Sequence, residues 1–465
     1  MSKRKTLGAR ALVIGGSMVG LAVARVLGES FDEVVVVERD SLARDQPQHR
    51  RGVPQSYHIH NLTLRGQREL EALFPGFGAE AVRLGAVQID HGSDVARCTV
   101  AGFQTQFQSD FVALSATRAL LEFAERSRFL ALVNNAVLLT DMRVTELLVE
   151  ARGDGPRAVG VRTDSCDRPE IRADLVVDCS GRAALWKKWF VQHGLPLPRE
   201  TVVDSKCGYS SRFVRPRDPE RYPWKALTVD SVFPQQPHWG VIVPLEHGEW
   251  VITLGGFNGD YPPTDEPGFQ RFARSLLTPL YAEALEDAEP LTLIRPFRGM
   301  EMRWNHFESG KLPLSRFLVL GDAAFAYNPL YGQGMSIGVT CARILRDELQ
   351  SRPRLDGLAA RLYPQLKSFA FPYWEGTALN DMRWPGTVGT RPWTMPILQK
   401  LGVFLLEASH YEKDIMRAIL ASVHMLKPPL GMVRSPRVLL ALVRFATRRL
   451  LSALPPGDHA QPVVE

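Results

Sequence analysis

The sequence has few cysteines, and none are paired at metal-binding spacing. The five are scattered along 465 residues, at Cys98, Cys166, Cys179, Cys207 and Cys341. This pattern argues against a Cys-x-x-Cys zinc site and predicts reduced thiols in a cytosolic protein. No run of about 18 apolar residues occurs, so no transmembrane helix is expected. The N-terminus leads into a predicted strand without an apolar leader, and we expect no signal peptide.

Lysine is also scarce: only 11 of the 56 basic residues are lysine, and the net charge is +6. No basic run is interleaved with aromatic residues, which argues against nucleic-acid binding. Residues 437–454 place Arg437, Arg444, Arg448 and Arg449 near one face of a predicted helix. Two interpretations stay open for this helix. It packs on the core as a surface helix, or it contacts a membrane surface or the entrance for an apolar substrate.

A glycine-rich turn near the N-terminus predicts dinucleotide binding. The turn joins a buried strand, "RALVIG", to a helix, and its Gly-x-Gly-x-x-Gly pattern has Ser17 in place of the middle glycine. Glu38 ends the next strand, where its two oxygens can hold the ribose hydroxyls of an adenosine. Arg39 follows and would suit a 2′-phosphate, so this motif does not separate FAD from NADP. The residues predicted to bind the cofactor here are Gly15, Ser17, Met18, Gly20, Glu38 and Arg39.

A second motif lies some 300 residues later, in "LVLGDAAFAYNPLYGQGMSIG" at 318–338. Asp322 ends a predicted strand, the place where ligands of open α/β sheets collect, and its carboxylate suits the hydroxyls of a ribityl chain. Gly332 and Gly334 let backbone amides face a flavin ring, and Met335 lies in the first turn of the helix that follows. Two such motifs fit one extended FAD better than they fit NAD.

The two motifs together resemble those of the FAD-dependent monooxygenases of the aromatic-hydroxylase superfamily. "DLVVDCSGR" at 174–182 is similar to their middle motif, with Ser180-Gly181 in place of Asp-Gly. "RRGVPQSYHIH", "VDSKCGYSSRFVRP" and "NPLYGQGMS" resemble a narrower bacterial group that includes the polyene epoxidases of polyether biosynthesis. The resemblance covers roughly residues 8–350 and implies that Arg118 and Arg51 lie near the FAD. Phe325 and Ser336 depart from the superfamily, which often has histidine and asparagine there.

The resemblance implies an α/β fold in which a discontinuous Rossmann-type FAD-binding domain carries an inserted antiparallel sheet and a C-terminal helical region. The FAD-binding domain is expected at 1–80, 111–195 and 301–352. Substrate-domain strands are expected at 81–110 and 196–300, the helical region at 353–455, and a disordered tail at 456–465.

The inserted sheet offers a candidate substrate pocket. A hairpin turning at His247-Gly248 alternates Trp239, Val241, Val243, Trp250, Ile252 and Leu254, which we interpret as one apolar face. Phe325 and Tyr327 would add aromatic rings from the flavin side. No catalytic residue, triad or metal cluster is evident, and the flavin-proximal candidates are Phe325, Pro329 and His60. For His58 and His60, a surface or loop-stabilising role stays open.

The resemblance implies a cytoplasmic enzyme that takes one oxygen atom from O2 through a flavin C4a-hydroperoxide, and peripheral membrane contact stays open. NAD(P)H would reduce the flavin directly or through a separate flavin reductase. The expected substrate is a hydrophobic, alkene-bearing polyketide or terpenoid that is epoxidised. The alternatives are an aromatic hydroxylase, a flavin-dependent halogenase, an isoprenoid double-bond reductase, or a non-enzymatic lipid escort. The halogenase signature WxWxIP is absent around Trp239.

Overall fold

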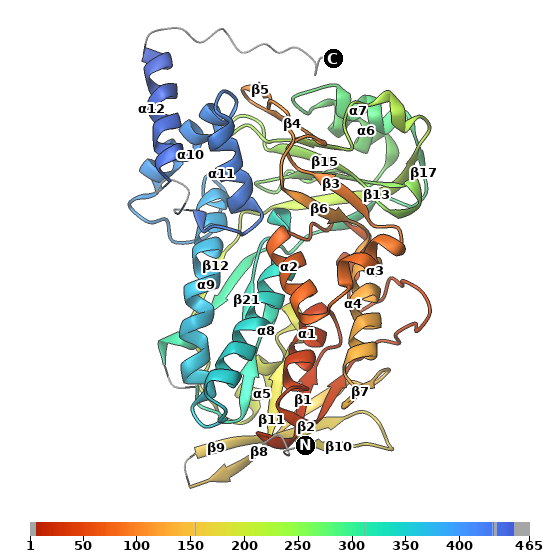
Figure 1. Cartoon of the computed structure of the whole chain (residues 1–465), viewed down its shortest axis with the longest axis vertical. Helices are drawn as coiled ribbons and strands as arrows, with labels where there is room; N and C mark the ends of the chain where they lie inside the picture. The colour runs from red at the N-terminus through yellow and green to blue at the C-terminus, as the bar shows by residue number, and fades with distance from the viewer. Residues whose placement is uncertain (1–5, 154, 311, 430, 432–434, 451–465) are drawn as a thin grey trace.

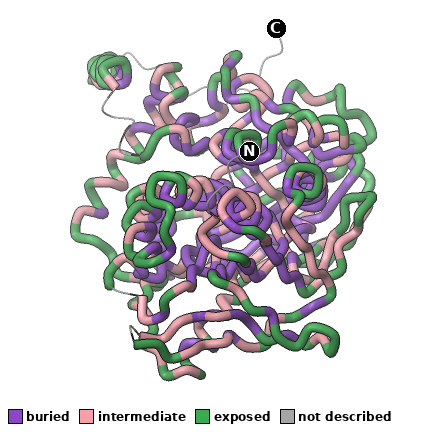
Figure 2. Tube along the Cα trace, turned by 60° about the horizontal axis from the view of Figure 1, so that its bottom comes forward, coloured by how far each residue is buried: buried purple, intermediate pink, exposed green. Residues whose placement is uncertain are grey.

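The computed structural model describes residues 6–153, 155–310, 312–429, 431 and 435–450. The tail expected at 456–465 lies outside the described residues. Figure 1 shows the elongated molecule, with the parallel sheet toward one end and the antiparallel sheet and C-terminal helices toward the other. Figure 2 shows that buried positions gather inside, beneath partly exposed helices and loops.

A five-stranded parallel sheet forms the centre of the FAD-type half. Its strand order is β20-β11-β1-β2-β7, and every neighbouring pair is parallel. The strands are β1 (Gly8–Ile14), β2 (Phe31–Val37), β7 (Ala136–Leu139), β11 (Leu175–Asp178) and β20 (Phe317–Val319). The four valines that end β2 are buried, as expected for a parallel strand covered on both faces.

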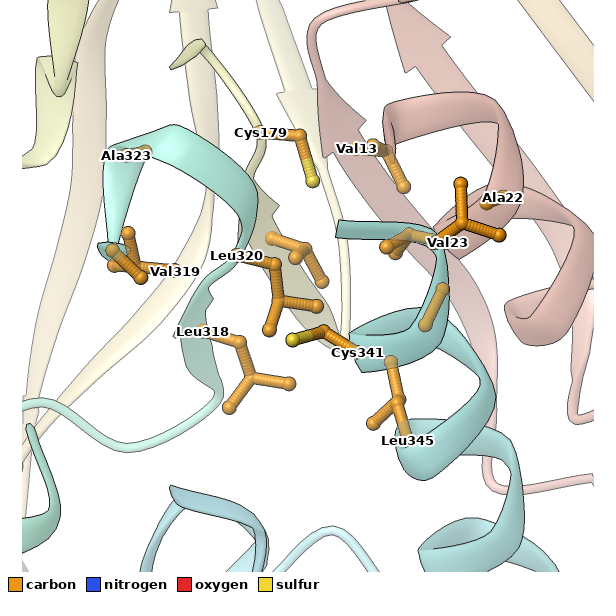
Figure 3. Close-up of a cluster of buried hydrophobic side chains, with 14 of the residues drawn as sticks. Val13, Ala22, Val23, Cys179, Leu318, Val319, Leu320, Ala323, Cys341 and Leu345 are labelled. Carbon is orange, nitrogen blue, oxygen red and sulfur yellow. The ribbon is translucent and has the colours of Figure 1, made fainter. Parts of the chain in front are cut away.

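Two helices from opposite ends of the chain cover one face of this sheet. They are α1 (Met18–Leu27) and α8 (Gly334–Ser351). They approach closely because Gly338 has no side chain: a Cβ there would come within 2.3 Å of Val19. Figure 3 shows Leu318 of β20 and Leu320, which directly follows β20, pointing toward Cys341 and Leu345 of α8, while Val319 points away. This core joins the two segments that carry the predicted nucleotide motifs.

Smaller elements flank the parallel sheet. A three-stranded antiparallel sheet consists of β8 (Val144–Arg152), β9 (Gly155–Thr163) and β10 (Glu170–Arg172). The flanking helices are α2 (Leu64–Leu73), α3 (Phe77–Arg83), α4 (Arg118–Leu132) and α5 (Leu185–Gln192). One short sheet pairs β3 (Val87–Asp90) with β6 (Val112–Ser115). Another has the order β12 (Glu200–Val203), β19 (Met302–Asn305) and β21 (Phe325–Ala326).

The second large sheet has eight strands in the path β17-β13-β16-β15-β14-β4-β5, with β18 paired to β13. Its strands are β4 (Val95–Thr99), β5 (Gly102–Phe103), β13 (Gly208–Pro216), β14 (Ala226–Val229), β15 (His238–Pro244), β16 (Trp250–Gly256), β17 (Ala288–Pro290) and β18 (Arg295–Phe297). Helices α6 (Glu266–Arg274) and α7 (Leu280–Glu286) cover one of its faces. The predicted hairpin is β15–β16, and His247 in its turn has φ +60°.

The predicted single apolar face of this hairpin is wrong. Trp239 pairs with Gly255 and Val243 with Val251, whereas Trp250 pairs with Pro244 and Leu254 with Gly240. Directly paired residues share a face, so Trp239, Val241 and Val243 lie on the face opposite Trp250, Ile252 and Leu254. The second set packs against the helices α6 and α7. Alternation along each strand was right, but the cross-strand register was not readable from the sequence.

The chain ends in helices α9 (Leu358–Asp381), α10 (Met395–Ser409), α11 (Lys413–Val423) and α12 (Pro436–Leu450). The expected fold class, a mixed α/β fold with parallel and antiparallel sheets and a helical C-terminal region, is confirmed. The finer domain boundaries stay a prediction. Within the residues described here, no helix is both long and apolar enough to cross a bilayer.

Candidate functional site

The predicted cofactor residues gather at one edge of the parallel sheet. Gly15 follows β1, Glu38 follows β2, and Asp322 follows β20. Because parallel strands all end at the same edge, these residues share it. Neighbouring strands lie about 4.8 Å apart, so three steps separate the ends of β2 and β20 by roughly 14 Å. A ligand that touched both carboxylates would have to be extended across β1 and β11.

The glycine turn between β1 and α1 is built for close approach. Gly15 has φ +101°, which favours glycine, and a Cβ on Gly20 would come within 1.8 Å of the Gly15 carbonyl oxygen. Ser17 is integrated into this turn. Its hydroxyl accepts a hydrogen bond from Arg118 Nη2 at 2.7 Å and donates one to Glu122 Oε2 at 2.9 Å. Met18 opens α1 and is fully buried.

Glu38 is held in place by its neighbours. Its Oε2 accepts a hydrogen bond from the Gly16 amide at 2.8 Å, and its Oε1 lies 3.1 Å from Arg50 Nη1. Arg50 also reaches Asp40 at 3.1 Å and Glu122 at 2.6 Å. Burial opposes the charge of Arg50, but the carboxylates of Glu122 and Glu38 raise its pKa. Arg50 thus links the predicted adenosine end of the site to the region around Ser17.

Arg51 and Arg39 lie outside this cluster. Both side chains are exposed, and Arg39 makes only a long contact, 3.5 Å, to the Gly52 carbonyl oxygen. The place of Arg51 near the FAD stays a prediction. Its neighbour Arg50, which the sequence analysis did not single out, is the arginine of this loop that pairs with Glu38 and Glu122.

Asp178 ends β11, and Asp322 lies in a 3-10 turn just after the neighbouring strand β20, but the two carboxylates differ in their partners. Asp178 accepts hydrogen bonds from the amides of Ser180 at 2.8 Å and Trp186 at 2.9 Å. Nothing in the described part of the chain hydrogen-bonds the Asp322 carboxylate, which lines a cavity of about 180 Å³ beside Arg182 and Asn305. Burial raises the pKa of Asp322, and Arg182 and Arg118 partly offset this. A half-buried carboxylate with free lone pairs suits a ligand's hydroxyl groups.

Arg118 offers a matching donor. Its side chain is buried, and its Nε lies 3.5 Å from Glu122 Oε2 but has no hydrogen-bond partner among the described residues. An unsatisfied buried guanidinium N–H suits a phosphate oxygen. The sequence-predicted residues therefore fit FAD: Glu38 would hold the adenosine ribose, Arg118 the diphosphate and Asp322 the ribityl hydroxyls.

The loop before α8 is stabilised from the C-terminal region. Pro329–Tyr331 form a short 3-10 turn, and Gly332 follows with φ +63°. The Asp381 carboxylate at the end of α9 accepts hydrogen bonds from Tyr331 at 2.6 Å, Asn328 at 2.9 Å and Ser205 at 3.1 Å. Burial raises the pKa of Asp381 to about 6, and these three donors partly offset that rise.

Earlier in α9, two residues of the helix hold the segment that leads into this loop. Ala370 accepts a hydrogen bond from the Tyr327 hydroxyl at 2.8 Å, and Trp374 Nε1 donates one to the Ala326 carbonyl at 3.3 Å. Gly334 and Met335 then open α8, and a Cβ on Gly334 would contact Asp322 Oδ1 at 3.4 Å. The C-terminal helix α9 therefore forms the support of the predicted flavin loop.

The histidines near this loop are poor bases. Burial lowers the pKa of His60 to about 3, with a further contribution from Arg118, and its Nδ1 lies 3.0 Å from the His58 carbonyl oxygen. Burial also lowers the pKa of His58 to about 4, and His58 Nδ1 lies 2.9 Å from Ser211 Oγ. Both rings are neutral at neutral pH, and His58 has the loop-stabilising role that the sequence left open.

An aromatic cluster lies next to the flavin loop. Trp239 and Val241 belong to it, and Leu330 of the loop packs against it. The cluster contains Cys207, Tyr209, Trp239, Phe257, Met300 and Trp384, with Phe233, Val241, Phe297 and Leu330 at its border. Val243 lies in a neighbouring small cluster with Phe213 and Leu245. This face of the sheet is the one that meets the cofactor half.

Phe325 and Tyr327 are packed away from this cluster. Phe325 stacks on Trp304 with ring centroids 4.1 Å apart, and Tyr327 bonds to α9. Both are buried in the main core, and their role in lining a substrate pocket stays a prediction. Pro329 is partly exposed at the start of the loop turn. No group of three or more His, Cys, Asp or Glu in the described ranges could hold a metal ion.

Comparisons with known proteins agree with this geometry. No family model matches the chain. Protein Rv3254 of Mycobacterium tuberculosis is 33% identical over 389 residues, which cover 80% of this chain and 80% of that protein. The chain belongs to the family of protein Rv3254.

Other proteins similar to this chain have names that state an activity. A kynurenine 3-monooxygenase of Salinispora tropica is 26% identical over 76% of this chain and 75% of its own length. A menaquinone reductase of M. tuberculosis is 25% identical over 76% of this chain and 78% of its own length.

Solved structures show the same fold. The FAD-dependent monooxygenase PqsL of Pseudomonas aeruginosa matches with a TM-score of 0.59 at 16% identity, covering 81% of this chain and 98% of PqsL. The p-nitrophenol 4-monooxygenase PnpA of Pseudomonas putida matches with a TM-score of 0.63 at 19% identity, covering 92% of this chain and all of PnpA. The fold is that of flavoprotein monooxygenases, and the likenesses are consistent with an enzyme of this kind, as the sequence predicted.

The structure adds four polar residues that the sequence analysis did not assign: Arg50, Glu122, Arg182 and Asp381. Arg182 directly follows Gly181 in the middle motif and donates a hydrogen bond to the Tyr327 carbonyl oxygen at 3.1 Å. Its place after a strand-end glycine was a usable signal. Asp381 had none, because it lies within a helix about 50 residues after the loop that it contacts.

Proposed function

We propose that this chain is an FAD-dependent monooxygenase that transfers one oxygen atom from O2 to an apolar organic substrate. The observation that carries the proposal is the half-buried Asp322 carboxylate, which has no hydrogen-bond partner in the described residues, on the same sheet edge as Glu38 and the Gly15 turn. When bound, FAD reduced by NAD(P)H or a separate reductase supplies the activation of O2. The residues of the chain bind and orient the cofactor and exclude water from the reaction.

The substrate that we propose is an alkene-bearing natural product, which the enzyme epoxidises. The face of β15 toward the flavin loop is apolar, with Trp239 and Val241 in the aromatic cluster. Epoxidation needs no base to remove a substrate proton, and the nearest histidines, His58 and His60, are poor bases at neutral pH. The likeness to polyene epoxidases supports the same class.

A second candidate, aromatic hydroxylation, is favoured by one observation. Tyr331 in the flavin loop donates a 2.6 Å hydrogen bond to Asp381, and the pKa of Asp381 is raised by burial to about 6. A carboxylate with a pKa near neutral can accept a phenolic proton through a tyrosine. The kynurenine 3-monooxygenase relative supports this alternative, and the likeness to the p-nitrophenol 4-monooxygenase PnpA supports only the fold.

Three further functions are alternatives that the experiment below must distinguish. The likeness to a menaquinone reductase supports a reductase that saturates isoprenoid double bonds. The flavin-dependent brominase Bmp2 has a TM-score of 0.65 at 11% identity, covering 96% of this chain and all of Bmp2, which supports only the fold of a halogenase. A non-enzymatic lipid escort would bind a substrate and turn nothing over.

The decisive experiment incubates the purified, FAD-loaded protein with NAD(P)H and a polyene, under air enriched in ¹⁸O2 and again without oxygen. A parallel set uses a phenol, and a third adds a flavin reductase. Epoxide that carries one ¹⁸O atom and forms only under air supports the proposal. A labelled catechol would indicate an aromatic hydroxylase, and a saturated product formed without oxygen would indicate a reductase. The absence of product in every arm would overturn the proposal that the chain is an enzyme.

A further inference from the structure

Helix α12 has two apolar faces. Val438, Ala441 and Phe445 point inward and pack against α10 and α11 in a small core of their own. A second set of apolar side chains points outward, with exposed fractions of 49% to 85%: Leu439, Leu440, Val443 and Leu450. Leu439 and Val443 lie four residues apart and Leu450 seven further on, so these three form one stripe along the helix. The inner face holds α12 against α10 and α11, and the outer stripe makes no part of this core.

This part of the chain gathers exposed apolar side chains. Of the twenty large apolar side chains that are exposed in the described residues, eight lie between residues 395 and 450. Trp393, just before α10, is 86% exposed. Single exposed apolar residues are ordinary, but seven of these eight lie on the three helices α10, α11 and α12, and such a concentration is typical of a contact surface. Figure 1 shows α10, α11 and α12 together at one corner of the molecule.

The same part carries the net charge of the protein. Residues 395–450 contain nine Lys and Arg against three Asp and Glu, whereas the whole chain has a net charge of +6. The rest of the chain is therefore balanced. Three arginines of α12 pair with glutamates of the neighbouring helices: Arg444 and Arg448 with Glu412, and Arg449 with Glu407. The surplus of basic residues remains after these pairs are made.

We propose that the outward face of α12 docks on a lipid surface that carries anionic headgroups. Leucine and valine side chains in a stripe bordered by arginines are the pattern of a helix lying in a membrane interface. The basic surplus complements anionic lipid, and each basic residue near such a surface adds attraction. A second copy of this chain fits less well, because it would bring two positively charged helical regions together. The inference does not depend on the activity proposed above.

The test is vesicle binding by the full-length protein. Co-sedimentation with vesicles of phosphatidylcholine mixed with phosphatidylglycerol is compared with phosphatidylcholine alone, at low and high salt. We expect binding to the anionic vesicles that weakens in high salt. The triple variant Leu439→Gln, Leu440→Gln, Val443→Gln should lower the partition coefficient about tenfold or more. Glutamine keeps helix propensity, so α12 should persist, and circular dichroism checks this.

The matched control replaces three apolar residues that are exposed to a similar degree outside this region: Leu130→Gln, Val191→Gln and Leu293→Gln. It should bind vesicles like the unchanged protein. Light scattering gives the molar mass of each protein in solution. A dimer that the α12 variant, but not the control, converts to a monomer would overturn the proposal and assign the stripe to self-association. A monomer without affinity for anionic vesicles would overturn it as well.

Discussion

Glu38 and Arg50 form a buried ion pair of 3.1 Å across the loop that follows β2. The pair fixes the carboxylate predicted to hold the adenosine ribose, while Arg50 reaches on to Glu122 and thereby to Ser17 and Arg118. The adenosine end and the diphosphate end of the site are thus parts of one network of charges. Disturbing one end is expected to affect ligand binding at the other.

The Glu38→Ala variant should bind FAD more weakly. It removes a charged acceptor for two ribose hydroxyls, which is worth about 1.5–3 kcal/mol, or roughly 10- to 150-fold in Kd. Fluorescence titration of the apoprotein with FAD measures this. The control is Glu33→Ala on the same strand, which breaks only a half-exposed pair with Arg10 and should leave the Kd unchanged. Equal affinity for the Glu38 variant and the unchanged protein would remove Glu38 from the site.

The neighbouring variants Arg50→Gln and Arg51→Gln separate the two arginines. Loss of Arg50 leaves buried carboxylates without their partner and should cost about 3–5 kcal/mol of unfolding free energy. Loss of Arg51, an exposed side chain, should change it by less than about 0.5 kcal/mol. Urea unfolding and FAD titration give both values. A larger loss of FAD affinity for Arg51→Gln than for Arg50→Gln would show that Arg51, rather than Arg50, is the arginine that serves the cofactor.

The Asp322→Asn variant should be more stable without FAD than the unchanged protein but should bind FAD more weakly. Burial raises the pKa of Asp322 in the folded protein, so the folded state holds its proton more tightly and the charged form lowers stability at neutral pH. The variant without FAD should therefore unfold at a higher temperature than the unchanged protein, yet gain less when FAD is added. Differential scanning calorimetry with and without FAD tests both parts. Ser17→Ala should lose less FAD affinity, and the reverse order would contradict the roles of the two residues.

Asp381→Asn should flatten a pH dependence. The pKa of Asp381 is raised to about 6 in the folded protein from an ordinary value near 3.8, so its contribution to stability falls as pH rises through this window. The variant lacks this titration, and the difference in melting temperature between variant and unchanged protein should grow in the variant's favour from pH 4 to 6. A shifted flavin absorption spectrum in the variant would show that the flavin loop has changed its conformation. Parallel stability curves would contradict the assignment.

Trp239→Phe and Trp250→Phe test the two faces of the hairpin. Both side chains are about 95% buried, and each substitution should cost about 1–2 kcal/mol of stability. Only Trp239 lies on the face toward the flavin loop, so only Trp239→Phe should also change KM or the fraction of NAD(P)H consumption that yields product. Equal kinetic effects from both variants would mean that stability, rather than contact with substrate, is responsible.

The sequence predicted the parts of this fold that depend on local pattern. The valine run of β2 and the glycine turn before α1 each have a signal within a few residues, and each lies where it was expected. The last strand before Asp322 ends at Val319, three residues earlier than expected, and Asp322 lies in a 3-10 turn. The predictions that failed depend on register and on distant contacts. Alternation along β15 and β16 says nothing about which residues become partners across the hairpin, and so the face of Trp250 was misassigned.

The site shows the same division. Glu38 follows from strand and motif, whereas Arg50 and Arg51 are indistinguishable in sequence because both are arginines in a polar loop. Only the fold decides that one reaches inward to Glu122 and that its neighbour stays exposed. Asp381 lies beyond any local pattern, because its partners Asn328 and Tyr331 are brought to it by the packing of α9 on the main core.

The order of strands in the parallel sheet has a consequence for synthesis of the chain. β1 is central, but β20 is made some 300 residues after it. At about 5–20 residues per second, the ribosome needs roughly 15–60 s to deliver that stretch. Until β11 and then β20 emerge, an apolar strand edge waits unpaired, which exposes the growing chain to wrong pairing and aggregation. A cofactor that needs both Glu38 and Asp322 therefore finds its complete site only on a nearly finished polypeptide. It can stabilise the fold only after that point.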